Sequence, residues 1–154
     1  MWWGMFRGMF EHTIDEKGRV AIPVRFRESL QATNDDRLVI TNFVVSCVRC
    51  LDVYPYAAWL QLEERLQAKP QFNQRVMWFQ NYYFAAAHEC ILDKQGRVLL
   101  PPTLREYAGL KREVVFSSAL EKFRLWDREQ WKRVFGEAEQ SIIDHPEDLN
   151  DLGI

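Results

Sequence analysis

Cysteine and histidine are scarce in this 154-residue sequence, with three of each, and this scarcity limits the metal and redox sites that the chain can build. Cys47 and Cys50 form a C-x-x-C pair, and His88 and Cys90 are two further soft ligands. Zinc needs three or four such groups at one point, and nothing in the sequence brings His88 and Cys90 to the 47–50 connection. We therefore predict reduced cysteines, no bound metal and no cofactor.

Long hydrophobic runs are absent as well. No run of eighteen apolar residues occurs, so the sequence predicts no transmembrane helix. The first four residues, Met1-Trp2-Trp3-Gly4, lack the apolar stretch of a signal peptide. A translation start at Met5 would make them incidental or disordered. We therefore expect a cytoplasmic protein with no membrane partner.

Catalytic motifs are missing too. His12, His88 and His145 lie far apart with no nucleophile near them, and the H-E-x-x-H, G-x-S-x-G and phosphate-loop patterns do not occur. No local pattern singles out any of the 22 acidic residues. A small β-barrel enzyme would therefore have no candidate residues, and we predict neither an enzyme nor a small-molecule substrate.

Charge is small overall but unevenly distributed. The net charge is −2, yet residues 137–154 carry six acidic side chains and no lysine or arginine, which leaves +4 on the other 136 residues. Residues 17–27 contain four basic side chains and no acid. Because salt screens charges beyond roughly 8 Å, a remote acidic tail does not cancel such a patch. The patch is either a contact for a phosphate backbone or a plain solvated face.

One stretch of the sequence occurs twice, at residues 15–28 and 93–106. The two copies share seven identities in fourteen positions, where ordinary residue usage would give about one. The repeat predicts two copies of a unit of about 45–55 residues. Units that small rarely hold a sufficient core alone, so we expect the two copies to pack on each other. In chain order, we predict a first unit at 9–56, a helical connection at 57–86, a second unit at 87–130, and a C-terminal helix with an acidic tail at 131–154.

The repeated stretch predicts a tight β-turn. Asp15 and Gly18, like Asp93 and Gly96, stand three residues apart, which suits a type I turn whose Asp accepts backbone N–H groups and whose Gly takes a positive φ. Alternating polarity before and after the turn predicts a β-hairpin with a four-residue corner. The Asp and Gly residues are explained by turn geometry alone.

A short helix should follow each hairpin. Pro23 suits the first helical position, and Phe26 and Leu30 stand one helical turn apart, so they would pack beneath the hairpin with Val20 and Ile22. The corresponding second-copy residues are Val98, Leu100, Pro101, Leu104 and the Tyr107/Leu110 pair.

Further elements follow from periodicity. We predict strands at 38–45 and 51–55, joined through a connection at 46–50, with counterparts at 114–117 and 123–127. Residues 56–84 should form two helices separated at Pro70, and a helix should run from 127 to about 141, followed by a poorly ordered acidic tail. The aromatic residues between 78 and 84 favour a core or subunit interface over a base-stacking platform.

The doubled Asp-x-x-Gly-Arg motif, each followed by an apolar stretch and Pro, resembles the MraZ family of bacterial transcriptional regulators. The agreement covers residues 5–8, 15–27, 53–55, 89–90, 93–105, 107–110 and 125–127. This resemblance implies a fold that is mainly β with α: two tandem AbrB/SpoVT-like swapped-hairpin β-barrel-type units joined by two helices. It also implies a ring-like homo-oligomer.

The same resemblance implies a function at the nucleoid. Members of the family bind double-stranded DNA at repeated promoter boxes upstream of the division and cell-wall gene cluster, usually as repressors of their own operon. The DNA-binding arginine of the family falls on Arg19, with Arg97 as its second-copy counterpart. We expect Lys17, Arg7 and Lys94 to neutralise phosphates. The alternative is an oligomeric scaffold without DNA binding, whose arginines pair with acids such as Glu28, Glu106 or the tail.

Overall fold

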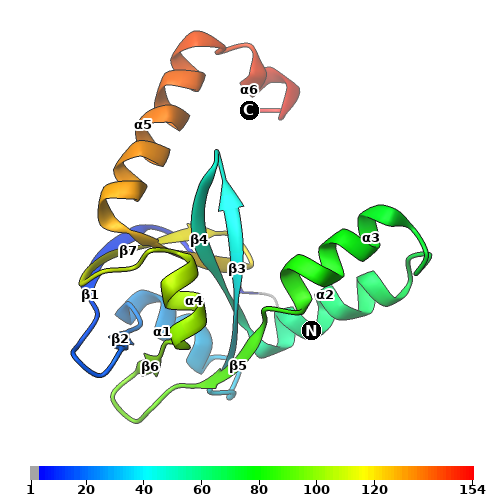
Figure 1. The fold of residues 1–154 in the computed structure, drawn as a ribbon. Helices are drawn as coiled ribbons and strands as arrows, with labels where there is room; N and C mark the ends of the chain where they lie inside the picture. The colour runs from blue at the N-terminus through cyan, green and yellow to red at the C-terminus, as the bar shows by residue number, and fades with distance from the viewer. Residues whose placement is uncertain (1–3) are drawn as a thin grey trace.

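The computed structural model of the chain describes residues 4–154 (Figure 1). Met1, Trp2 and Trp3, for which we predicted disorder or no role, lie outside the described residues. The first copy of the repeat forms β1 (Met9–Thr13), β2 (Arg19–Ala21), α1 (Val24–Gln31), β3 (Arg37–Val45), β4 (Val48–Pro55) and α2 (Tyr56–Gln67). The second copy forms β5 (His88–Ile91), β6 (Arg97–Leu99), α4 (Pro102–Tyr107), β7 (Glu113–Ala119), β8 (Lys122–Asp127) and α5 (Arg128–Asp144). Between them lie α3 (Gln74–Phe79) and the π-helix η1 (Gln80–Phe84), and α6 (Asp148–Asp151) ends the chain.

The strands form an antiparallel six-stranded sheet in the order β1-β7-β8-β4-β3-β5 and a separate two-stranded ribbon, β2–β6. The large sheet is pseudo-symmetric: equivalent strands of the two copies, β1 and β5, β7 and β3, and β8 and β4, lie at equal distances from its centre. The predicted β scaffold carrying helices is therefore confirmed, and strands of both copies share one sheet.

The two strands of each predicted hairpin stop pairing with each other just beyond the corner. The strand pairing across the first corner is limited to the bridge between Ile14 and Val20, beside which the Asp15 N–H donates to the Arg19 carbonyl at 2.8 Å. Beyond it, β1 pairs with β7 and β2 pairs with β6, both from the second copy. The simple hairpin prediction is corrected in this respect: each strand finds its main partner in the other copy, which buries more apolar surface than an isolated hairpin can.

The core lies between the large sheet and the short helices. Val20, Ile22, Phe26 and Leu30 are all buried, as predicted, and the ring of Phe26 lies 4.7 Å from that of Phe123 on β8. Helix α1 begins one residue after Pro23, which serves as its N-cap. The buried aromatic cluster thus ties the first-copy helix to a second-copy strand, and truncating such a ring typically costs about 3–5 kcal/mol.

A buried polar network joins the two central strands to η1. Asp52 on β4 lies opposite Arg124 on β8 and accepts a hydrogen bond from its Nε at 2.8 Å. The hydroxyl of Tyr83 donates to the same carboxylate and lies 2.8 Å from the hydroxyl of Tyr54. Because Asp52 is fully buried, these hydrogen bonds replace those that its carboxylate would make with water. Burial raises the pKa of Tyr54 to about 12 and holds the pKa of Tyr83 far above its usual value.

One predicted connection and the C-terminal tail have a different structure from the one predicted. The connection predicted at 46–50 is a two-residue turn, in which Ser46 and Cys47 both have positive φ, as a type I′ hairpin requires. The tail predicted to be poorly ordered continues α5 to Asp144 and then forms α6. Figure 1 shows that α2–α3 and α5–α6 project from the sheet as two separate arms.

Candidate nucleic-acid interface

The first corner, residues 15–19, is held by one carboxylate. Oδ1 of Asp15 accepts the backbone N–H groups of Lys17 and Arg19, both at 2.9 Å, and Oδ2 accepts Nε of Arg19 at 2.8 Å. The Gly18 N–H donates to the Asp15 carbonyl at 3.0 Å, and Gly18 has φ +85°. The predicted turn chemistry is therefore confirmed, and the carboxylate additionally orients the guanidinium.

The second corner, residues 93–97, repeats this geometry. Oδ1 of Asp93 accepts the N–H groups of Gln95 and Arg97 at 2.9 Å each, and Oδ2 accepts Nε of Arg97 at 2.9 Å. In both corners the backbone hydrogen bond from the arginine lowers the pKa of the aspartate, and the arginine side chain lowers it further. Both carboxylates are therefore ionised at neutral pH.

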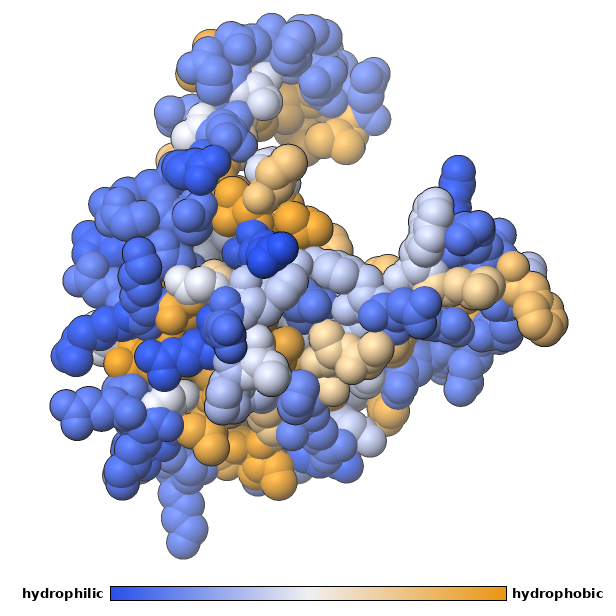
Figure 2. All heavy atoms as spheres, viewed as in Figure 1, coloured by the Kyte–Doolittle hydropathy of each residue, from blue (hydrophilic) through white to orange (hydrophobic). Residues whose placement is uncertain are grey.

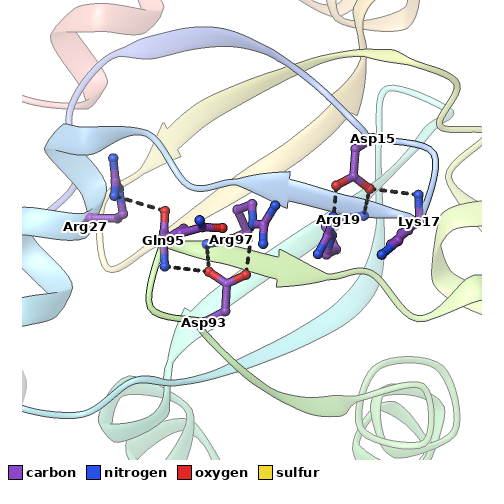
Figure 3. Close-up of polar contacts among 7 residues, drawn as sticks. All are labelled: Asp15, Lys17, Arg19, Arg27, Asp93, Gln95 and Arg97. Carbon is purple, nitrogen blue, oxygen red and sulfur yellow. Dashed lines mark hydrogen bonds and ion pairs between the residues drawn. The ribbon is translucent and has the colours of Figure 1, made fainter.

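The β2–β6 ribbon places both corners on one outer surface. Arg19 lies opposite Leu99, Val20 opposite Val98, and Ala21 opposite Arg97. Paired residues of antiparallel strands point to the same face, so the two valines face the core while both arginines face outward. Their positions are diagonal neighbours, with Cα atoms roughly 7–8 Å apart. Figure 3 shows the two clusters at opposite ends of the paired strands.

The side chains of Arg19 and Arg97 are partly exposed, and an aspartate engages only the Nε atom of each guanidinium. The side chains of Arg19 and Arg97 are 29% and 31% exposed. Their Nε atoms engage their own aspartates, and their Nη nitrogens make no hydrogen bond with residues 4–154. The guanidinium is therefore pre-oriented, with its terminal fork available for a planar acceptor pair. Neither arginine pairs with Glu28, Glu106 or the tail.

The copies brace each other's corners. The Ile22 N–H donates to the Gly96 carbonyl at 2.9 Å, and the Leu100 N–H donates to the Gly18 carbonyl at 3.0 Å. Arg27 on α1 lies over the second corner, where its Nη1 reaches the Gln95 carbonyl at 3.4 Å (Figure 3). Nothing local in the sequence predicts this role for Arg27, although an arginine recurs at the equivalent position, Arg105 on α4.

The predicted phosphate contacts divide into two groups. Lys17 and Lys94 are exposed at their respective corners, beside the arginines. Arg7 is also exposed, but it lies between Phe6, which is bridged to Leu120, and the start of β1. That position is at the end of β1 away from the first corner, so the structure does not bring Arg7 to the two lysines.

Comparison with known proteins identifies the family. The family model described as "MraZ protein, putative antitoxin-like" matches residues 5–81 and 83–152. The chain belongs to the MraZ family. The relative "Transcriptional regulator MraZ" from Desulforamulus reducens is 40% identical over 148 residues, covering 96% of this chain and 99% of the relative. Proteins of the same name from Thioalkalivibrio sulfidiphilus and Desulfitobacterium hafniense are 45% identical over 127 residues (82% and 83% covered) and 40% identical over 150 residues (97% and 100% covered).

Membership of the MraZ family agrees with the sequence prediction of a transcriptional regulator that is not an enzyme. Within residues 4–154, no cluster of three or more His, Cys, Asp or Glu side chains is arranged to hold a metal ion. Cys47 is exposed at the β3–β4 turn, whereas Cys50 is buried and burial raises its pKa to about 12. None of the helices described combines the length and hydrophobicity needed to span a bilayer.

Proposed function

We propose that this MraZ-family protein is a sequence-specific regulator that binds double-stranded DNA through the outer face of the β2–β6 ribbon. The observation that supports this proposal is the pair of identically built corners whose arginine forks point away from the core. The major groove, about 12 Å wide, admits a two-stranded β-ribbon, and an arginine fork matches the O6 and N7 acceptors of guanine.

The arginine and the lysine at each corner have different roles in this proposal. Arg19 and Arg97 read a base edge, or grip a phosphate where no guanine is present, because the aspartate leaves only their terminal nitrogens free. Lys17 and Lys94 neutralise phosphates next to the groove, a contribution that is independent of sequence and falls with salt. Arg7, at the far end of β1, would contact DNA only outside the stretch that the ribbon covers.

One ribbon supplies few contacts, so affinity must come from several copies. We propose that a ring-like homo-oligomer engages repeated promoter boxes, and that effective concentration converts several weak contacts into firm binding. In this proposal, the boxes lie upstream of the division and cell-wall gene cluster, which contains the protein's own gene. Binding represses that operon, and the protein acts in the cytoplasm, at the nucleoid. The acidic tail, on the α5–α6 arm, does not oppose this binding because it lies away from the ribbon (Figure 1).

The decisive experiment compares Arg19→Ala and Arg97→Ala with Arg49→Ala, which removes the same charge from an exposed position on β4, outside the ribbon and both arms. The probes are a duplex from upstream of the protein's own gene and a scrambled duplex of equal length, followed by fluorescence anisotropy. Losing one bidentate contact should cost about 1–3 kcal/mol. Arg19→Ala should therefore bind the upstream duplex at least severalfold more weakly, whereas Arg49→Ala should bind as the wild type does.

Two further measurements separate the alternatives. Arg19→Lys keeps the charge without the fork, so it should retain binding to the scrambled duplex and lose discrimination between the two. A protein that is only a scaffold would show no salt-dependent affinity for either duplex. Wild-type binding by both alanine variants would refute the assignment of the arginines.

A further inference from the structure

The tip of the α2–α3 arm carries an uncovered aromatic side chain. Phe72, in the connection between the two helices, is 97% exposed. Trp78 on α3 is also exposed. The arm, residues 56–84, contains Arg65, Lys69 and Arg75 against Glu63 and Glu64, a net charge of +1. These exposed aromatic side chains at the end of a projecting arm offer an apolar surface for a partner to cover.

The α5–α6 arm carries an apolar stripe that loses its cover part-way along the helix. Trp131 lies 5.5 Å from the ring of Trp126 on β8 and 5.9 Å from that of Phe135. The same helical face continues through Ala138 to Ile142, which is 50% exposed. Figure 2 shows hydrophobic side chains on the inner side of this arm, toward the hollow between the two arms.

Within the described residues, 4–154, no other element covers the outer part of α5. From residue 135 to residue 144 every position is exposed. Short helical stretches without packing partners are marginal in water, so a partner along the apolar stripe would stabilise this outer part of α5. The acidic side chains of residues 137–154 give the arm a local charge of −6.

We propose that the Phe72 tip of one copy docks on the Phe135–Ile142 face of α5 in the next copy. This inference rests on the homo-oligomer of the proposed function and names its contact surfaces. Within one chain the two arms project apart (Figure 1), so they cannot cover each other. The opposite charges favour this pairing, whereas two α5–α6 arms placed together would bring −6 against −6.

Such an interface is head-to-tail. Each copy offers a tip to one neighbour and an α5 face to the other, so the contact repeats until the rotation closes a ring. The β2–β6 ribbon belongs to neither arm and stays free on every copy, which is what several simultaneous DNA contacts require.

The test uses two full-length variants, Phe72→Asp and Ile142→Asp, each of which disables one half of the interface. Both residues are exposed, so the variants should fold, which circular dichroism and thermal melting check. Light scattering should give the 18.3 kDa mass of one chain for each variant alone. Mixed in equal amounts, they should form a dimer and nothing larger, because one intact tip meets one intact α5 face. Ile91→Asp on β5, at 63% exposure, is the control and should keep the wild-type mass.

Three results would overturn the proposal: a monomeric wild type, a Phe72→Asp protein with the wild-type mass, or a mixture that stays monomeric. Failure of the DNA-binding proposal is read separately, because Arg19→Ala tests DNA contact at unchanged mass. An oligomer that ignores both aspartates but binds DNA through Arg19 would refute only the interface.

Discussion

Gly18 and Gly96 occupy equivalent corners, and they should respond unequally to the same substitution. Both have positive φ, +85° and +74°, so alanine at either position incurs the left-handed cost of about 1–2 kcal/mol. Their surroundings differ. A Cβ on Gly18 would meet Nη1 of Arg105 at 3.4 Å and Cδ1 of Leu99 at 3.7 Å, and both atoms are the ends of side chains.

At Gly96 the added methyl group would collide with Arg27. Cζ of Arg27 would lie 2.9 Å from the new Cβ, and its Cδ closer still, so the side chain must leave its place over the corner. Overpacking of this kind typically costs a further 1–3 kcal/mol or so. We therefore expect Gly96→Ala to lower the free energy of unfolding by about 2–5 kcal/mol and Gly18→Ala by about 1–2 kcal/mol.

The assay is urea unfolding followed by tryptophan fluorescence, at one protein concentration for all variants because the protein is expected to self-associate. The control is a double-mutant cycle with Arg27→Ala. Without the Arg27 side chain, Gly96→Ala should cost no more than Gly18→Ala does. Equal losses at the two glycines, or no relief from Arg27→Ala, would show that the cross-copy contact does not shape the second corner.

Three further predictions concern other sites. Asp52→Ala should lower the free energy of unfolding by about 3–5 kcal/mol because it breaks a buried ion pair, and Tyr83→Phe by about 1–3 kcal/mol because it leaves polar partners unsatisfied; urea unfolding measures both, and losses below 1 kcal/mol would contradict the network. Burial, and then the charge of Arg27, lower the pKa of His12 from 6.5, so the unfolded chain takes up the proton first. Stability should therefore fall as the pH drops below 6.5, and a His12→Gln variant whose melting temperature falls just as steeply between pH 7.5 and pH 5.5 would rule out this origin. Lys17→Ala should reduce the slope of log affinity against log salt by about 1 without changing discrimination between duplexes, and an unchanged slope would mean that Lys17 contacts no phosphate.

Local chemistry explains which features of the corners could be predicted. Asp15 and Gly18 define their turn through hydrogen bonds within five residues, and Val20 and Phe26 follow from strand and helix periods. The turn at Ser46 and Cys47 was missed because neither residue signals positive φ as Gly or Asn does. The DNA roles of the arginines remain predictions, since neither the turn nor the strand period requires them.

Contacts between distant segments were beyond the reach of the sequence pattern. A hairpin motif does not say whether its strands pair with each other or with another copy, and the placement of Arg27 over Gly96 depends on that exchange. The position of Arg7 likewise depends on the direction of β1 within the sheet.

The sequence by itself determined two tight turns, each followed by an arginine, because short-range hydrogen bonding and side-chain alternation need no information from elsewhere in the chain. Only the tertiary structure decided that both arginines share one outward face and that two uncovered arms flank the sheet. The reason is physical: strand partners and exposed faces depend on which arrangement of the whole chain buries the most apolar surface.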